Sequence, residues 1–526
     1  MTEVATQSQR DSAHGVRPVA VIDIGATSIR LAIAEITTDG RIRTLETLSQ
    51  TASLGKDTFT RGVLRKETIE QCVRILKSYR RMISEYQIDL RKDVRAVATS
   101  AVREARNRLA FVDRIYIATG LQVQTLDEGE VNRITYLGVL PYLQADETLQ
   151  SGRVLVVEVG GGSTELIVVR GPNVMFSHTY RLGAMRLRKT LEAYRTPASQ
   201  VRELMNNEIL RTVDEVGNEV SSSQVQMMAL GGDMRFATRQ LLPEWRAGEL
   251  ARVNVSELER LVATILDLSD DEVVRRYHLT FPEAEIIGPA LLSNLTLAQS
   301  FGLKEILVTN TNLRDGMLQE MAVSEGWTSE LRRQVIRSAV DLARKYHSDE
   351  QHALHIAEIA KQLFVRLEAE HQMDQRYETL LATAAILHEI GKYVNVRSYH
   401  KHTMYLIRNS ELFGLSGQEL TLVALIARYH RRASPQQSHE AYTSLRRDQR
   451  VAVSKMAALL RLAKALDASR SQRITHFRYQ RRRNSIDIHV TGVEDLALEQ
   501  LALRQSGSLF EEIYGLPVHL RVDRKS

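Results

Sequence analysis

Three consecutive glycines in the N-terminal half of the chain stand between acidic and hydroxyl side chains. Residues 154–169 read VLVVEVGGGSTELIVV, so that Glu158 precedes the glycines and Glu165 follows them. Backbone without Cβ atoms lets ligand oxygens approach its amides, and successive N–H groups form a concavity for an anion. Because the carboxylates would repel a bare phosphate, the pattern favours a phosphate bound together with a divalent cation. An ordinary glycine-rich β-hairpin is the alternative interpretation. The phosphate-binding candidates in this segment are Gly161, Gly162, Ser163 and Thr164.

The same pattern occurs a second time near the N-terminus. Residues 19–33 read VAVIDIGATSIRLAI, an apolar stretch followed by an acid, a glycine, two hydroxyls and another apolar stretch. The phosphate-binding candidates of this copy are Gly25, Thr27 and Ser28. Repeated units indicate a duplicated architecture, so we expect the two hairpins to face each other across a cleft. Asp23, Glu158 and Glu165 are the expected ligands of the cation, which would be Mg²⁺ or Mn²⁺.

An arginine follows the next expected strand, at residues 94–99. Ser100 is expected to cap the helix after this strand, which places Arg103 one turn into the helix. Helix N-termini favour anions, and a guanidinium group can hold phosphate oxygens in a bidentate fork. The alternative is that Arg103 only forms an ion pair with Glu104 or another nearby acid.

Five short motifs follow one another along the N-terminal part of the chain. They are Asp23-Ile24-Gly25, ATSAVR at residues 98–103 with Asn107, GGGSTE at residues 160–165, Gly231-Gly232, and LRDG at residues 313–316. In type and order they resemble the motifs of the exopolyphosphatase/guanosine pentaphosphate phosphatase family, within the actin-like ATPase superfamily. The resemblance implies an α/β fold whose N-terminal half is a duplicated, actin-like (ribonuclease H-like) pair of lobes. It also adds Gly231 and Gly232, at the end of an expected buried strand, to the phosphate-binding residues.

The resemblance further implies a catalytic carboxylate within residues 123–139, VQTLDEGEVNRITYLGV. Family members place a glutamate immediately before an Ala-Arg pair here, where it polarises the attacking water. Alignment from the C-terminal end of the segment puts Val131 at that position. Glu130 is therefore the expected general base, although neighbours on a helix differ in direction by about 100°. Relatives also usually have aspartate in place of Glu158 and asparagine in place of Thr27.

Histidines crowd together in the C-terminal half, where nine of the 15 lie between residues 347 and 439. Residues 346–364, 385–391 and 459–467 resemble an HD-type helical domain. The resemblance implies a second site for a divalent metal, held by imidazole and carboxylate groups. Its ligands would be His352, His388, Glu389 (where aspartate is usual) and Asp467. The alternative is a helical domain that serves substrate binding and dimerisation.

The length and composition of the chain are those of a globular protein with several domains. The chain has 526 residues, of which 43% are hydrophobic and 25% charged, as in an ordinary globular protein of several domains. The expected divisions are a disordered leader at 1–18, actin-like lobes at 19–140 and 141–325, an all-α HD-like domain at 326–470 and a small α+β appendage at 471–526.

The composition also limits the cellular location and the binding partners that we expect. Cys72 is the single cysteine, which excludes an intramolecular disulfide and fits a reducing cytoplasm. The first 18 residues lack the apolar stretch of a secretory signal, and no apolar run approaches the ~20 residues of a membrane helix. We therefore expect a cytoplasmic homodimer without a membrane or nucleic-acid partner. The net charge of +6 suits a polyanionic substrate.

Together these features favour a hydrolase that releases terminal orthophosphate from inorganic polyphosphate, or from the 5′ end of guanosine pentaphosphate. A kinase is less favoured, because the sequence identifies no second acceptor pocket. Two further interpretations remain open. One is a catalytically weak protein that senses polyphosphate or guanosine tetraphosphate, and the other is a metal-dependent phosphodiesterase-type reaction in the HD-like half.

Overall fold

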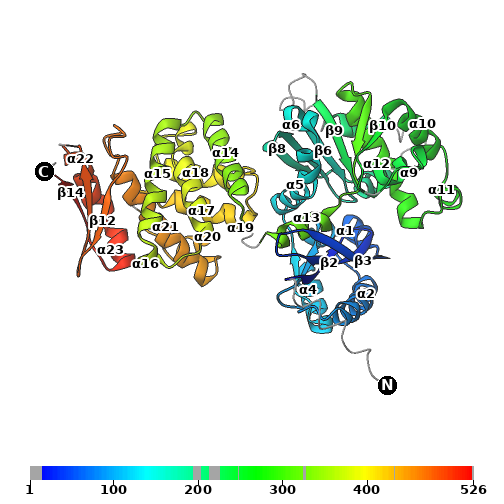
Figure 1. Cartoon of the computed structure of the whole chain (residues 1–526), viewed down its shortest axis with the longest axis horizontal. Coiled ribbons are helices and arrows are strands. Elements are labelled where there is room, and N and C mark those ends of the chain that lie inside the picture. Colours follow the sequence, from blue (N-terminus) through cyan, green and yellow to red (C-terminus); the bar gives the residue numbers. More distant parts are fainter. Residues whose placement is uncertain are drawn as a thin grey trace. The chain divides into compact units, whose positions relative to one another are not determined.

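The computed structural model describes residues 15–193, 203–211, 225–246, 248–323, 327–431, 433–493 and 495–523. The chain divides into two compact units, Met1–Gly326 and Trp327–Ser526 (Figure 1). Residues 1–14 of the expected leader lie outside the described residues, and the first strand already begins at Arg17.

The first lobe of the N-terminal unit is a five-stranded sheet with the strand order β3-β2-β1-β4-β5. Strands β1, β2 and β3 are antiparallel, whereas β1, β4 and β5 are parallel. The strands are β1 (Arg17–Ile24), β2 (Ser28–Ile36), β3 (Ile42–Thr51), β4 (Val94–Ala98) and β5 (Val123–Thr125). The helices are α1 (Leu54–Arg61), α2 (Lys66–Glu85), α3 (Ser100–Arg103), α4 (Arg108–Thr119) and α5 (Glu128–Ala145). Most side chains of β1 and β2 are buried, as the nearly continuous apolar runs predict.

The second lobe is a six-stranded sheet with the order β10-β11-β9-β6-β7-β8. Its strands are β6 (Arg153–Val159), β7 (Thr164–Arg170), β8 (Asn173–Tyr180), β9 (Val225–Leu230), β10 (Ala251–Asn254) and β11 (Glu305–Val308). Its helices are α6 (Glu147–Ser151), α7 (Ala184–Ala193), α9 (Gly232–Leu241), α10 (Val255–Leu266), α11 (Asp270–Tyr277) and α12 (Phe281–Ser300).

The two sheets repeat one topology. The order β3-β2-β1-β4-β5 of the first lobe corresponds to β8-β7-β6-β9-β11 of the second, with an antiparallel hairpin followed by parallel strands in both. Hairpin β1–β2 thus matches hairpin β6–β7. The duplicated two-lobed architecture and both expected hairpins are confirmed.

The last helix of the N-terminal unit, α13 (Leu313–Ala322), returns to the first lobe. Its Met317 and Leu318 share one buried cluster with Val19 and Val97 of the first sheet. A Cβ at Gly316 would clash with the backbone of α5, so this glycine permits the close approach of the two helices. The expected second lobe, residues 141–325, therefore ends with a helix that packs on the first lobe.

The C-terminal unit combines a helical bundle with a small sheet. Its helical elements are α14 (Ser329–Lys345), α15 (Glu350–Arg366), α16 (Glu368–His371), α17 (Arg376–Leu387), the short 3₁₀ helix η2 (Ile390–Tyr393), α18 (Tyr399–Arg408), α19 (Gly417–Arg428), α20 (Glu440–Thr443) and α21 (Arg447–Ala465). The appendage consists of β12 (Arg478–Arg481), β13 (Ile486–Thr491), α22 (Ala497–Ser506), α23 (Ser508–Tyr514) and β14 (Val518–Asp523). Ile488 and Phe510 of the appendage belong to the same hydrophobic cluster as Leu459 of α21, so bundle and sheet share one core. None of the described helices combines the length and the apolarity that a membrane span requires.

Candidate active site

A cavity of about 590 Å³ lies between the two lobes of the N-terminal unit. The lining residues that the sequence predicted as ligands are Asp23, Gly25, Thr27, Ser28, Arg103, Glu158, Gly161, Ser163, Glu165, Gly231 and Gly232. Two other predicted residues, Gly162 and Thr164, are not part of the lining. Gly162 packs against Phe59, and the Thr164 hydroxyl donates a hydrogen bond to the Leu182 carbonyl. The cavity thus brings together most of the expected site.

The two hairpin turns that border the cavity are built alike. In each turn a glycine amide donates a hydrogen bond to the carbonyl three residues on, from Gly25 to Ser28 at 3.0 Å and from Gly160 to Ser163 at 2.8 Å. The turns also touch, because a Cβ at Gly161 would lie only 2.9 Å from the Cβ of Ala26. Glycine at position 161 therefore lets the two turns form one wall.

Carboxylates occupy equivalent places on the two hairpins but face different partners. Asp23 pairs across the strands with Arg30, whose Nη1 lies 3.4 Å from the Asp23 Oδ2. Glu158 instead pairs with Glu165. Burial, and then the Glu158 charge, raises the pKa of Glu165 to about 7, although the Ser163 hydroxyl donates a hydrogen bond to it at 2.7 Å. Withdrawal from water also raises the pKa of Glu158.

The cavity is also lined by charged side chains that the sequence did not single out as ligands. They are Arg30, Asp233, Arg235, Arg239, Glu283 and Arg314. Burial raises the pKa of Asp233 to about 7, and Asn294 donates a hydrogen bond to its carboxylate at 2.8 Å. Arg235 donates to the Thr311 carbonyl at 3.2 Å. The sequence feature that could have identified Asp233 and Arg235 is the glycine pair Gly231-Gly232. Helix α9 begins at this pair, and its first turn carries both side chains to the cavity.

Arg103 reaches the cavity wall from α3. It donates a hydrogen bond to the Leu126 carbonyl at 3.1 Å and lies 3.5 Å from the Glu128 carboxylate. Glu128 is a nearby acid of the kind that the alternative interpretation names, whereas Glu104 binds Arg186 of the second lobe at 2.7 Å. The Arg103 side chain is thus placed where it can meet a ligand.

Glu130 is not among the residues that line the cavity, against expectation. As the third residue of α5 it closes a capping box with Asp127, in which each side chain accepts a backbone N–H of the other residue at 2.9 Å. Gln124 donates a further hydrogen bond to the Glu130 carboxylate at 2.8 Å. Val131, one residue on, does line the cavity. The expected general base is therefore used at the helix end, and the position that faces the cavity is apolar.

The oxygen-rich cavity fits a hard cation better than a transition metal. The Ser28 hydroxyl is buried there without a hydrogen-bond partner. Asp23, Glu158 and Glu165 do not form a compact set, because the one convergent group of three acidic or imidazole side chains in the described part of the chain lies elsewhere. Mg²⁺ would therefore use one or two of these carboxylates and complete its shell with water and phosphate oxygens.

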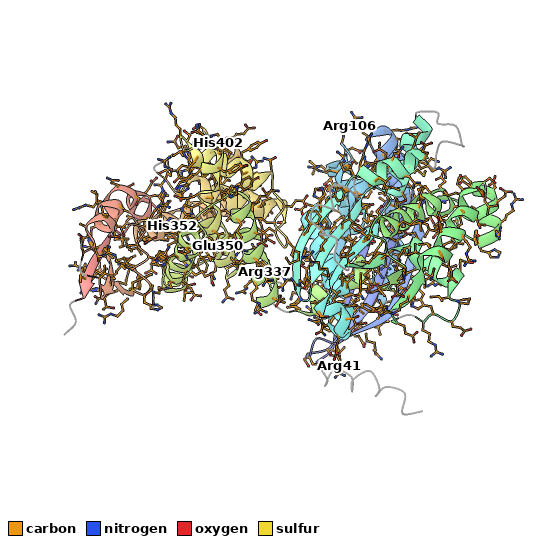
Figure 2. The ribbon with its side chains drawn as sticks, turned by 90° about the horizontal axis from the view of Figure 1, so that it is seen from above. Arg41, Arg106, Arg337, Glu350, His352 and His402 are labelled. Carbon is orange, nitrogen blue, oxygen red and sulfur yellow. The ribbon has the colours of Figure 1, made fainter. Side chains whose placement is uncertain are left out.

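The convergent group lies in the C-terminal unit and contains His352, His388 and Glu389, with ligand atoms within 4.8 Å of one another. His352, on α15, lies inside the body of this unit (Figure 2). Asp467, the fourth residue expected there, is not part of the group. Its carboxylate instead lies 2.9 Å from Nδ1 of His352.

Comparisons with known proteins agree with this architecture. The model of the Ppx/GppA phosphatase family matches residues 18–325, and the model of Ppx/GppA phosphatase, domain III, matches residues 334–510. An exopolyphosphatase from Cytophaga hutchinsonii is 21% identical with a TM-score of 0.53, over 59% of this chain and 98% of that one. An exopolyphosphatase-like protein is 20% identical with a TM-score of 0.51, over 58% and 98%. A Ppx/GppA family member from Aquifex aeolicus is 24% identical with a TM-score of 0.49, over 59% and 99%. Because the first family model spans more than half of the sequence, the chain belongs to the Ppx/GppA phosphatase family.

Proposed function

We propose that the N-terminal unit binds inorganic polyphosphate in the interlobe cavity and releases its terminal orthophosphate with the help of Mg²⁺ or Mn²⁺. The observation that carries the proposal is the composition of the cavity wall, where two matched glycine turns stand beside several arginines. Glycine turns give close access to backbone amides, and arginines supply charge for consecutive phosphates. The 5′ end of guanosine pentaphosphate presents the same chemistry and is a second substrate class for this site.

The arginines of the wall would hold the phosphate chain from both lobes. Arg103 projects from the first lobe and Arg235 from the second, and both line the cavity. Arg314, at the start of α13, lies close enough to Asp23 for the two charges to interact. Such fixed positive groups stabilise the charge that develops as a phosphoryl group is transferred.

Asp23 and Glu158 are the carboxylates that would hold the cation. A bound divalent ion supplies neutralisation of phosphate charge and polarisation of the reacting phosphoryl group. The equivalent positions of Asp23 and Glu158 on the two hairpins support this role, because each lobe would then supply one ligand of the ion.

Glu165 is the carboxylate best suited to accept the proton of the attacking water. It lines the cavity, and its pKa of about 7 in the metal-free protein lies near the working range of a general base. The Ser163 hydroxyl donates to Glu165 Oε1 and fixes its orientation. A cation beside Glu158 would lower this pKa and keep Glu165 ionised at neutral pH.

A second candidate function is binding without turnover, as a sensor of polyphosphate or guanosine tetraphosphate. The observation in its favour is Val131, an apolar side chain on the cavity wall next to the helix-capping Glu130. The glycine turns and arginines serve this function equally well.

Phosphate release and polyphosphate affinity, measured on one preparation with Mg²⁺, separate the two functions. For a hydrolase, Glu165→Gln should lower release by roughly 10²–10⁴-fold while polyphosphate still binds. The matched control is Glu257→Gln, at a half-exposed carboxylate on α10, which should leave both quantities unchanged. Wild-type protein that binds without release would select the sensor, and absence of binding would refute both functions.

A further inference from the structure

The C-terminal unit contains all the buried histidines of the described chain. They are His352, His371, His388 and His430. His371 uses both ring nitrogens, since Nε2 bonds a backbone carbonyl at 2.7 Å and Nδ1 accepts a backbone N–H at 3.0 Å. His430 likewise bonds the Ala427 carbonyl through Nδ1 and the Tyr399 hydroxyl through Nε2 at 3.0 Å. These two are satisfied core histidines.

His352 and His388 each have only one nitrogen satisfied. Nδ1 of His352 lies 2.9 Å from a carboxylate oxygen of Asp467, and Nδ1 of His388 lies 2.6 Å from the Ala385 carbonyl. Because these partners are acceptors, Nδ1 carries the proton in both rings and Nε2 keeps a bare lone pair. Both Nε2 atoms are buried without a partner. Buried lone pairs without a donor or a cation cost free energy.

The two histidines converge with the carboxylate of Glu389. Nε2 of His388 lies 3.8 Å from Oε1 of Glu389, and His352 contributes a ring nitrogen to the same group. The other oxygen, Oε2, is held by Lys392 and Arg470 at 2.5 Å each. These two basic side chains fix the carboxylate, while Oε1 lies near Nε2 of His388 and 3.9 Å from Nζ of Lys464.

The neighbourhood of this group decides which cation fits it. The positive charges of Lys392, Lys464 and Arg470 offset that of Glu389, so a hard ion bound mainly by charge would gain little. Imidazole nitrogens bind borderline transition metals well, and Zn²⁺ commonly uses two histidines and a glutamate with one open position. Partly buried His355 and His400 also have an unpartnered nitrogen, but neither joins the convergent group.

We propose that the C-terminal unit holds one transition-metal ion, such as Zn²⁺ or Mn²⁺, through Nε2 of His352, Nε2 of His388 and Oε1 of Glu389. A three-ligand set leaves a coordination position for water or a substrate oxygen. Asp467 is a positioning residue, because its carboxylate fixes the tautomer and orientation of His352. The site is independent of the interlobe cavity and of the function proposed for it.

The test is the metal content of the full chain, with any affinity tag removed, after incubation with Zn²⁺ and dialysis. We expect about one ion per chain, and chelation should lower the melting temperature. His352→Gln and His388→Gln should each lose the ion. The matched control His371→Gln changes a buried histidine whose nitrogens are both satisfied, and it should retain the ion. Asp467→Asn should weaken metal affinity by about 10–100-fold and be rescued by excess metal.

Three results would overturn the proposal. Retention of the ion by His388→Gln together with its loss in Asp23→Asn would place the metal in the N-terminal unit. Wild-type protein that takes up no ion and melts unchanged after chelation would mean that the two nitrogens are satisfied by buried water. Should His388→Gln fail to fold, Co²⁺ added to wild-type protein gives the decision, since absence of ligand-field absorption from nitrogen and oxygen coordination contradicts the site.

Discussion

Asp127 and Glu130 close a reciprocal capping box at the start of α5, with two hydrogen bonds of 2.9 Å each. This pairing fixes Glu130 to the backbone at the helix end and leaves Val131 on the cavity wall. The cavity therefore has the glycine turns and arginines expected of a phosphate site, but a valine at the position where the family resemblance leads us to expect the catalytic glutamate.

The first prediction concerns Glu130 itself. Glu130→Gln keeps the capping box, since glutamine serves at this position, and should leave phosphate release unchanged. Glu130→Ala removes the acceptor of the Asp127 N–H and should lower stability by roughly 0.5–1.5 kcal/mol. Urea unfolding and initial rates of phosphate release measure the two effects. A large loss of release in a stable Glu130→Gln protein would restore Glu130 as the general base.

The second prediction concerns the contact between the two turns. A Cβ at Gly161 would lie 2.9 Å from that of Ala26, so Gly161→Ala should push the turns apart. Polyphosphate affinity should fall at least about ten-fold, because the amides no longer fit the phosphate oxygens. Gly40→Asn is the matched control, since Gly40 has no neighbour within 4 Å and asparagine tolerates its positive φ. Equal affinities of the two variants would contradict the phosphate-binding role of the turns.

The third prediction concerns charge on the cavity wall. Arg103→Ala should lower polyphosphate affinity by about 10–100-fold, as expected for the loss of a charge-assisted hydrogen bond. It should also reduce the dependence of binding on salt concentration. Arg260→Ala, at an exposed arginine of α10, should change neither quantity. Arg103→Ala protein that binds with wild-type affinity at every salt concentration would remove Arg103 from the site.

The fourth prediction concerns pH and stability. Burial raises the pKa of Asp233 from its ordinary value of 3.8 to about 7 in the folded protein. The stabilisation from its protonated form is complete below about pH 4 and is lost as the pH rises through about 7. Relative to Asp233→Asn, which cannot ionise, metal-free wild-type protein should therefore lose free energy of unfolding over this interval. Denaturant unfolding from pH 4 to 8 gives both profiles, and superimposable curves would be evidence against the buried ionisable group.

Local patterns in the sequence predicted the parts of the fold that depend on neighbouring residues. The two hairpins are visible as apolar runs around glycine and hydroxyl residues, and Gly25 and Gly160 make equivalent hydrogen bonds. The return of α13 to the first lobe was not visible, because Met317 and Val19 meet only through the tertiary fold.

The same holds for the site residues: their types are visible in the sequence, but their contacts depend on residues far away in the chain. A one-residue shift along α5 exchanges Glu130 for Val131 at the cavity, and no local propensity distinguishes the two registers. Likewise the histidines of the C-terminal unit were visible as a cluster in sequence. Which of their nitrogens is free depends on partners such as Asp467, which is 115 residues away from His352.

The most direct test of hydrolysis in the interlobe cavity is the rate of orthophosphate release from polyphosphate by Val131→Glu and wild-type protein, with binding measured on the same samples. We predict that both proteins bind polyphosphate with Mg²⁺ and release orthophosphate, wild type through Glu165 and Val131→Glu at least as fast, because it has an additional carboxylate on the cavity wall. Leu109→Glu adds the same charge at a side chain that is 77% exposed and should leave the rate unchanged. Wild-type protein that binds polyphosphate but releases no orthophosphate would contradict hydrolysis in this cavity, whatever the rate of Val131→Glu.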